Sequence, residues 1–265
     1  MVGYTTLERY ELKYWVPPRL MSLVRAHVES FMVREQPGPA QRNVSLYLDS
    51  IDRQLYRAHL WGSPDRFKLR VRRYGAGPSE QVFAEVKRKV KDVVVKKRAV
   101  IAAADWSKVI EPTGPVPDPQ QHEFAYLLAV TGAVPQTVVA CERTAWVPRT
   151  TLDSSRVTID ENIVAYPWRG AFFDLDGRHA TPIDGEDEHA GEGRQAVLEL
   201  KFTGGAPGWM QGLVQRFGLY RTAYSKFCAA MRAIDPHAHA WLNTHSALAR
   251  AERDVYPDEL AAFPH

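Results

Sequence analysis

Lysine and arginine recur at every second position in several segments of this 265-residue sequence. The clearest segment is 66–73, where the alternating basic residues are Arg66, Lys68, Arg70 and Arg72. A guanidinium group binds two phosphate oxygens at once, and a lysine ammonium supplies a compact positive charge. Because these groups share one face of the segment, they predict a site for a polyanion such as polyphosphate.

The same alternation marks other segments as β-strands, since successive side chains of a strand point to opposite faces. The predicted strands are 9–16, 66–73, 83–90, 94–101, 139–147, 155–163 and 196–202. One interpretation is a half-exposed sheet, with its apolar face toward the core and its charged face toward water. A closed barrel with a charged lumen is favoured instead, because strand after strand places a cation near its middle. We therefore predict an α+β fold built on a closed antiparallel β-barrel with helices packed outside.

A basic lumen is costly without a ligand. Two like charges about 6 Å apart repel by about 3 kcal/mol at an effective dielectric constant of about 20, and desolvation adds to this cost. Regular occupation by a polyanion removes the repulsion. Because Arg9, Lys68 and Lys89 lie on the alternating charged faces, they are candidates for binding such a substrate.

Four carboxylates share the predicted inner face with these cations. They are Glu11, Glu85, Asp160 and Glu199. One interpretation gives them charge balance and orientation of the lysines. The other makes them ligands of Mg²⁺ or Mn²⁺, hard cations that take oxygen ligands and bridge phosphates. Glu199 is the first candidate because it shares a face with Lys201, and Glu11 and Glu85 are further candidates.

Helical periodicity predicts helices over 18–33, 120–131 and 209–234, and a further one in the tail at 238–251. No repeat or long linker divides the chain, so we expect one domain over 1–265, with its core at about 4–232 and a helical tail at 238–265.

Composition limits the class of protein. The chain is 45% hydrophobic and 25% charged, with a net charge of +3, as is ordinary for a globular protein. No stretch reaches the roughly 18 apolar residues of a membrane span, and the first residues lack an apolar signal core. Cys141 and Cys228 have no metal-ligand spacing and are expected to be buried thiols. We expect a reduced, cytoplasmic protein. Nucleic-acid binding is disfavoured, because aromatic residues do not interleave with the basic ones.

Several strings in this order resemble a known family. They are KYWV (13–16), SLYLD (45–49), RFKLRVRRYG (66–75), EVK (85–87), VKKR (95–98), RTA (143–145), LELK (198–201) and YSKF (224–227). Together they resemble the catalytic domain of the vacuolar transporter chaperone (VTC) polyphosphate polymerases, within the CYTH or triphosphate tunnel superfamily. The resemblance spans roughly residues 4–232.

The resemblance implies an eight-stranded antiparallel tunnel. It also implies transfer of the γ-phosphate of ATP to a growing polyphosphate chain, with Mn²⁺ or Mg²⁺ and release of ADP. Carried over by position, the phosphate contacts would be Lys13, Arg70, Arg72, Lys87, Lys97, Arg143, Arg156, Lys201 and Lys226. Glu199 would hold the metal.

The sequence departs from the family pattern in two places. Ala223 stands where a second lysine is expected, three residues before Lys226, which favours the alternative of a polyphosphate-binding module without synthesis. Hydrolytic superfamily members carry two alternate glutamates before the lysine of the first strand. Here Arg9 replaces the first of them, which weakens the alternative of a triphosphate or polyphosphate hydrolase. The membrane helices of larger polymerases have no counterpart here, so export would need a separate membrane partner.

Overall fold

The computed structural model describes residues 9–75, 80–90, 93–111, 118–150, 154–170, 172, 175, 177–185 and 193–235. Its strands are β1 Arg9–Val16, β2 Met32–Arg34, β3 Gln41–Asp49, β4 Asp65–Tyr74, β5 Gln81–Val90, β6 Val93–Ala102, β7 Val134–Pro148, β8 Arg156–Pro167, β9 Thr181–Pro182 and β10 Ala196–Thr203. Its α-helices are α1 Met21–Phe31, α2 Gln54–Leu60, α3 Trp106–Ile110, α4 Pro119–Thr131, α5 Gly208–Arg216 and α6 Lys226–Ile234. The predicted α+β class is confirmed.

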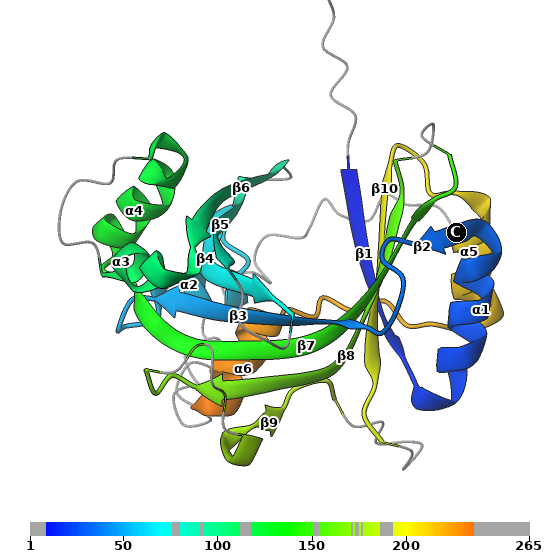
Figure 1. Ribbon diagram of the computed structural model, residues 1–265. Helices are drawn as coiled ribbons and strands as arrows, with labels where there is room; N and C mark the ends of the chain where they lie inside the picture. Colours follow the sequence, from blue (N-terminus) through cyan, green and yellow to red (C-terminus); the bar gives the residue numbers. More distant parts are fainter. Residues whose placement is uncertain are drawn as a thin grey trace, which may run out of the picture.

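The strands form one antiparallel sheet in the order β1-β10-β8-β7-β3-β4-β5-β6, and β2 and β9 add to β7 and β8. The sheet is strongly curved, so that β4, β5 and β6 form one arm and β1 and β10 the other (Figure 1). The concave inner face of the sheet between these arms is called the trough. Within the described residues, β1 and β6 end the path and do not pair with each other. The predicted closure of the barrel is therefore not confirmed.

A later segment of the chain occupies the free edge of β1. The amide of Thr222 donates to the carbonyl of Lys13 at 2.8 Å, and the amide of Trp15 donates to the carbonyl of Tyr220 at 3.3 Å. These bonds use edge groups of β1 that a closed barrel would pair with another strand. The edge is thus covered locally, without closure of the sheet.

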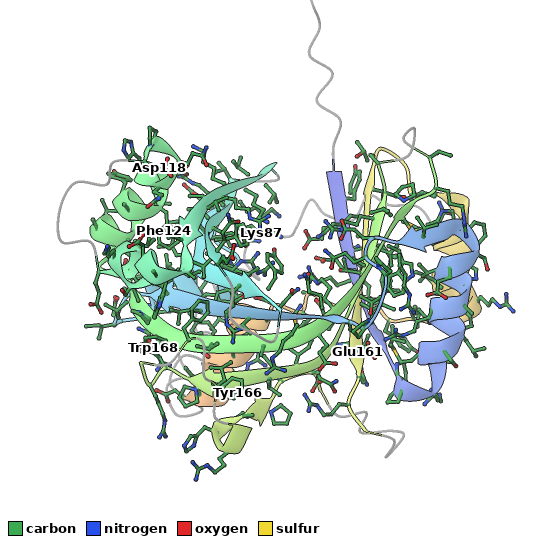
Figure 2. All side chains as sticks on the ribbon, viewed as in Figure 1. Lys87, Asp118, Phe124, Glu161, Tyr166 and Trp168 are labelled. Carbon is green, nitrogen blue, oxygen red and sulfur yellow. The ribbon has the colours of Figure 1, made fainter. Side chains whose placement is uncertain are left out.

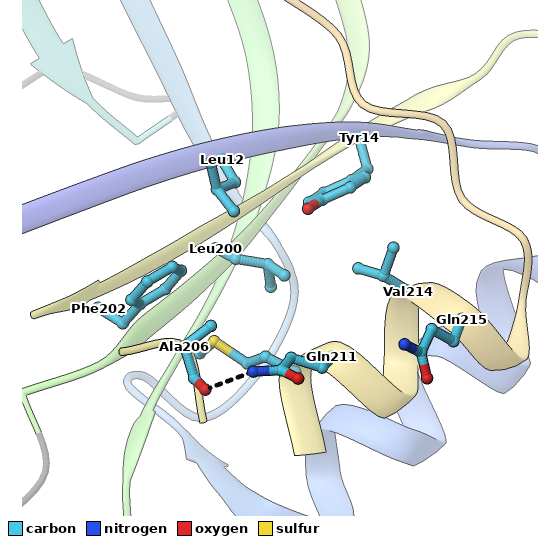
Figure 3. Close-up of a pocket in the computed structure, with 9 residues that line it drawn as sticks. Leu12, Tyr14, Leu200, Phe202, Ala206, Gln211, Val214 and Gln215 are labelled. Carbon is cyan, nitrogen blue, oxygen red and sulfur yellow. Dashed lines mark hydrogen bonds between the residues drawn. The ribbon is translucent and has the colours of Figure 1, made fainter. Parts of the chain in front are cut away.

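The outer face of the sheet is apolar and covered by helices. Over β1, β8 and β10, helices α1 and α5 contribute Val24, Val28, Met210 and Leu213 to a buried cluster with Leu198 and Leu200. Between α5 and strands β1 and β10 a hollow of about 230 Å³ remains (Figure 3). On the other arm, α4 packs against β5 and β6 and buries Phe124 and Leu128. The charged face must therefore be the inner one.

The helix predictions fared unequally. The predicted helix at 120–131 is confirmed as α4, and Gly132 follows it with a positive φ of 58°. The predicted helix at 18–33 begins with a 3₁₀ turn at Pro18–Leu20 and ends at Phe31, where β2 begins. The single helix predicted at 209–234 is wrong. The chain leaves α5 after Arg216, runs along β1, and starts α6 with Ser225 as the N-cap.

The predicted tail helix lies outside the described residues. Within the part that the structure describes, no helix is both long and apolar enough to cross a membrane.

Candidate functional site

Strand pairing gathers charged side chains on the inner face. Figure 2 shows Lys87 on the side of β5 that faces β1, and Lys87 donates to both carboxylate oxygens of Glu11 at 3.1 and 3.2 Å. This contact joins the two arms of the trough. The cations of the site are Lys13, Lys68, Arg70, Arg72, Lys87, Lys96, Arg98, Arg143, Lys201 and Lys226, and its carboxylates are Glu11, Glu85, Asp160 and Glu199.

On the arm formed by β4, β5 and β6, the cations gather around Glu85, which is 1% exposed. The Arg70 Nε donates to a carboxylate oxygen of Glu85 at 2.6 Å, and the Lys96 Nζ lies 2.7 Å from the other oxygen. Arg72 and Arg98 approach within 3.8 and 3.7 Å. Burial opposes ionisation of Glu85, but the cations, Arg70 above all, outweigh it and lower its pKa to about 2. Glu85 therefore remains a carboxylate that holds these cations in place.

At the base of the trough, Asp160 holds cations of β7 and α6 in place, as Glu85 does on the arm of β4, β5 and β6. Arg143 donates to both of its carboxylate oxygens at 2.6 Å, and Lys226 at the start of α6 pairs with it as well. Asp160 is 1% exposed. Although burial opposes its ionisation, Arg143 and Lys226 hold the pKa of Asp160 well below its usual range. Burial likewise disfavours the charged form of Lys226, yet Asp160 raises its pKa.

On the opposite arm, Glu11 of β1 and Glu199 of β10 are diagonal neighbours, since Glu11 is opposite Lys201 and Glu199 is opposite Lys13. Their carboxyl groups lie within hydrogen-bonding reach of each other, and Glu199 also accepts from Thr158 at 3.2 Å and pairs with Lys201 at 3.1 Å. Two carboxyl groups this close require a shared proton or a nearby cation, and Lys201 lies 3.1 Å from Glu199 and 3.9 Å from Glu11. Burial raises the pKa of Glu199, but its contacts with Glu11 and Lys201 hold it well below the usual range.

This pair fits a divalent cation, because hard cations take carboxylate oxygens. The fit is limited to two protein ligands, since no group of three His, Cys, Asp or Glu side chains gathers anywhere in the described residues. A metal held here would keep most of its coordination for water and phosphate oxygens, as Mg²⁺ commonly does.

A hollow of about 490 Å³ opens beside this pair. It is lined by Glu11, Lys13, Arg221, Thr222, Ala223 and Tyr224. Lys13 lies at its wall, where its Nζ donates to the carbonyl of Tyr224 at 3.0 Å. Burial lowers the pKa of Lys13, and Glu199 and Glu11 offset part of that effect. The hollow thus reaches Glu11 and Lys13 of the inner face.

Comparison with known proteins identifies the family. The sequence profile of the VTC domain matches residues 8–234 of the chain. The chain belongs to the VTC domain family. Among curated proteins, no sequence matches it.

A search of solved structures found chains similar to this one at low sequence identity, among them the following two. The PH1819 protein of Pyrococcus horikoshii OT3 is 13% identical, with a TM-score of 0.43, and the match covers 83% of this chain and 96% of that one. A Bacillus halodurans protein provisionally named an adenylate cyclase is 10% identical, with a TM-score of 0.48 and coverage of 81% and 92%. The family assignment depends on the sequence profile alone.

The inner face of this VTC domain contains most of the predicted site residues. The predicted placement of Lys97 is an exception. Lys97 does not face the trough: it pairs with Glu123 of α4 on the outer side. The register of β5 against β6 places Lys96 and Arg98 opposite Lys87 and Glu85 instead. Because adjacent residues of a strand point to opposite faces, Lys96 and Lys97 cannot both line the site.

Other predicted residues lie at the margins. Arg156 pairs with Glu35 at 2.6 Å on the rim, where both side chains are 38% exposed. Lys89 is opposite Arg66 near the end of β5. The side chain of Arg9 lies outside the described ones. Glu85, a predicted metal ligand, is enclosed by cations and separated from the Glu11–Glu199 pair, so its surroundings do not suit a metal.

The site of this VTC domain contains several polar residues that were not predicted from the sequence. Ser45 and Tyr47 of β3 receive hydrogen bonds from Arg72 at 3.1 Å and Arg70 at 3.4 Å, and Thr158 contacts Glu199. Ser225 receives a hydrogen bond from Lys68 at 2.9 Å. A signal existed for β3, since Ser45 and Tyr47 alternate with leucines.

Proposed function

We propose that this VTC domain is an ATP-dependent polyphosphate polymerase that transfers the γ-phosphate of ATP to the end of a growing polyphosphate chain in the trough. The observation that carries the proposal is the unbalanced charge of the inner face. In the described residues, its cations outnumber its carboxylates by more than two to one, and many of them are largely buried. Such a surplus is costly without a polyanion, and membership in the VTC family supports phosphate polymers as that polyanion.

In this proposal Glu85, Asp160 and the Glu11–Glu199 pair hold the cations in position for phosphate. Glu85 and Asp160 hold Arg70 and Arg143 in fixed orientations, so that outward N–H groups meet phosphate oxygens without reorganisation. Phosphoryl transfer gains mostly from positioning and from neutralisation of the charge that spreads over the transferred group. A terminal oxygen of the chain attacks the γ-phosphorus, the bond from the γ-phosphorus to the β–γ bridging oxygen breaks, and ADP leaves.

Glu199, with Glu11, would hold Mn²⁺ or Mg²⁺, which would neutralise phosphate charge when bound. Lys201 and Lys13 lie beside that pair, and Lys87 reaches Glu11 from the opposite arm. These lysines would bind the phosphates that enter between the arms.

The test is synthesis by the purified protein with ATP and Mn²⁺, followed by gel sizing of any polyphosphate. Chains should lengthen with time, and Glu199→Gln should abolish synthesis. A protein that binds polyphosphate tightly but makes none would refute the polymerase proposal.

That last outcome is the alternative that Ala223 favours. Ala223 lines the hollow beside Lys13 and is exposed, so the position that the family resemblance gives to a lysine adds no charge there. A binding module would retain Arg70-dependent affinity for polyphosphate with no turnover of ATP. Release of inorganic phosphate from tripolyphosphate, without chain growth, would indicate the hydrolase.

A further inference from the structure

Lys68 differs from the other cations of the inner face in its partner. Its Nζ donates to the hydroxyl of Ser225, the N-cap of α6, at 2.9 Å. Within the described residues, no carboxylate pairs with it, whereas Arg70 and Lys96 share Glu85, and Lys226 shares Asp160. A partly buried lysine paired only with a neutral hydroxyl lacks the usual compensation for its charge.

The charged and titratable groups around Lys68 come from five elements. They are Arg66 and Arg70 on β4, Lys87 on β5, Lys13 on β1, His59 on α2 and Cys228 on α6. The ring of Phe227 lies 6.0 Å from its Nζ. Most of these neighbours are cations, and none is a carboxylate.

These surroundings favour the neutral amine. Burial lowers the pKa of Lys68 to about 7, with Lys13, Lys87 and Arg70 adding to the effect and the Cys228 thiol opposing it. His59 is affected in the same way, since burial first and then Lys68 lower its pKa to about 3. The two groups therefore share surroundings that disfavour positive charge.

We propose that Lys68 is a proton-linked ligand contact, which binds a proton from solvent when a phosphate polyanion enters and then donates to a phosphate oxygen. The inference rests on the proposed function, because the ligand is the same polyanion. A phosphate oxygen next to Lys68 supplies the negative charge that the free site lacks, so the bound state favours the ammonium. The direction is fixed by linkage: binding weakens as pH rises through neutrality, where the free amine loses its proton.

Two measurements on the full chain test this inference. In the free protein, NMR of ¹³C-labelled lysine side chains should show one Cε signal that titrates near pH 7 and is absent in Lys68→Met. Calorimetry with tripolyphosphate at pH 8, in two buffers of different ionisation enthalpy, should show uptake of nearly one more proton by the wild type than by Lys68→Met. From pH 6 to pH 8, the Kd of the wild type should rise about tenfold more than that of Lys68→Met.

Met at position 68 is uncharged, as the free lysine is at pH 8, so this variant is expected to fold. The matched control is Lys108→Met on α3, an exposed lysine whose loss should leave both readings unchanged. A Lys68 signal that titrates only above pH 9, or equal proton uptake in the wild type and Lys68→Met, would overturn the inference while the polyanion site remains. A neutral-pH titration without any binding of tripolyphosphate would instead overturn the proposed function, and the inference with it.

Discussion

Strand β1 borders two hollows of opposite chemistry, one on each of its faces. The outer one, of about 230 Å³, lies under α5 and is lined by Leu12, Tyr14, Leu200, Phe202, Ala206, Met210, Gln211, Val214 and Gln215 (Figure 3). The inner one, of about 490 Å³, is bordered by Glu11 and Lys13. A step of one residue along β1 separates the two environments, because strand side chains alternate.

The difference teaches that shape alone does not identify the site. The outer hollow is an imperfection in helix–sheet packing, and its apolar lining residues belong to a continuous apolar cluster. The inner hollow adjoins buried charges whose arrangement costs free energy unless a ligand compensates it. Substitutions on the inner face should therefore change ligand binding and activity, and those on the outer face should change stability alone.

The largest expected effect is at Arg143, whose side chain is held by Asp160. Arg143→Met should lower the rate of polyphosphate synthesis about 10²–10³-fold, as the loss of one preorganised charge donor does in other enzymes. Arg143→Lys keeps the positive charge but loses the guanidinium that binds two oxygens at once. Its rate should fall between those of the wild type and Arg143→Met. Rates at saturating ATP, with thermal unfolding as the check on folding, would decide it; near wild-type synthesis by Arg143→Met would argue against an inner-face site.

The second effect is a pH dependence of stability from Glu85. Because its pKa is about 2 in the folded protein, below its ordinary value, the unfolded chain binds the proton more readily. This carboxylate thus adds about 3 kcal/mol of stability that is present above pH 5 and lost as pH falls from about 4.5 to about 2. The free energy of unfolding of Glu85→Gln, measured by urea titration, should fall less steeply with acid than that of the wild type. Parallel curves would show that Glu85 is not held by the cations.

Sequence alone predicted the inner face well where alternation and pairing agree. On β4 and β5, Arg70 and Glu85 were placed on one face, and the structure pairs them directly. The VKKR string was harder, because alternation leaves open which lysine faces the site; the pairing of Lys87 with Lys96 decides it. The helix predicted at 209–234 was wrong for a tertiary reason. Tyr224 has helical spacing in the sequence, but its ring packs on Trp15 of β1, with the centroids 4.7 Å apart.

A smaller effect should separate the two neighbouring lysines of β6. Lys96→Met removes a cation bonded to Glu85 and should weaken tripolyphosphate binding about tenfold, which corresponds to about 1.4 kcal/mol. Lys97→Met removes an exposed pair with Glu123 on the outer side and should leave the Kd unchanged. Calorimetric titration of both variants measures the contrast. Equal losses of affinity would mean that both lysines reach the ligand and that the register of β6 is different.

The smallest effect compares one alanine from each hollow. Ala206→Val adds two methyl groups to the apolar hollow and should raise the free energy of unfolding by about 0.5–2 kcal/mol, as cavity-filling substitutions do. Valine suits the position, because the residue before a proline favours extended backbone. The affinity of Ala206→Val for tripolyphosphate should not change. Ala223→Lys in the inner hollow should raise the affinity for tripolyphosphate and leave the free energy of unfolding unchanged. A cation beside Lys13 attracts phosphate but adds no apolar packing. Urea unfolding and calorimetry on both variants test the crossed pattern; a gain of affinity in Ala206→Val would show that the two faces are coupled through β1 and β10.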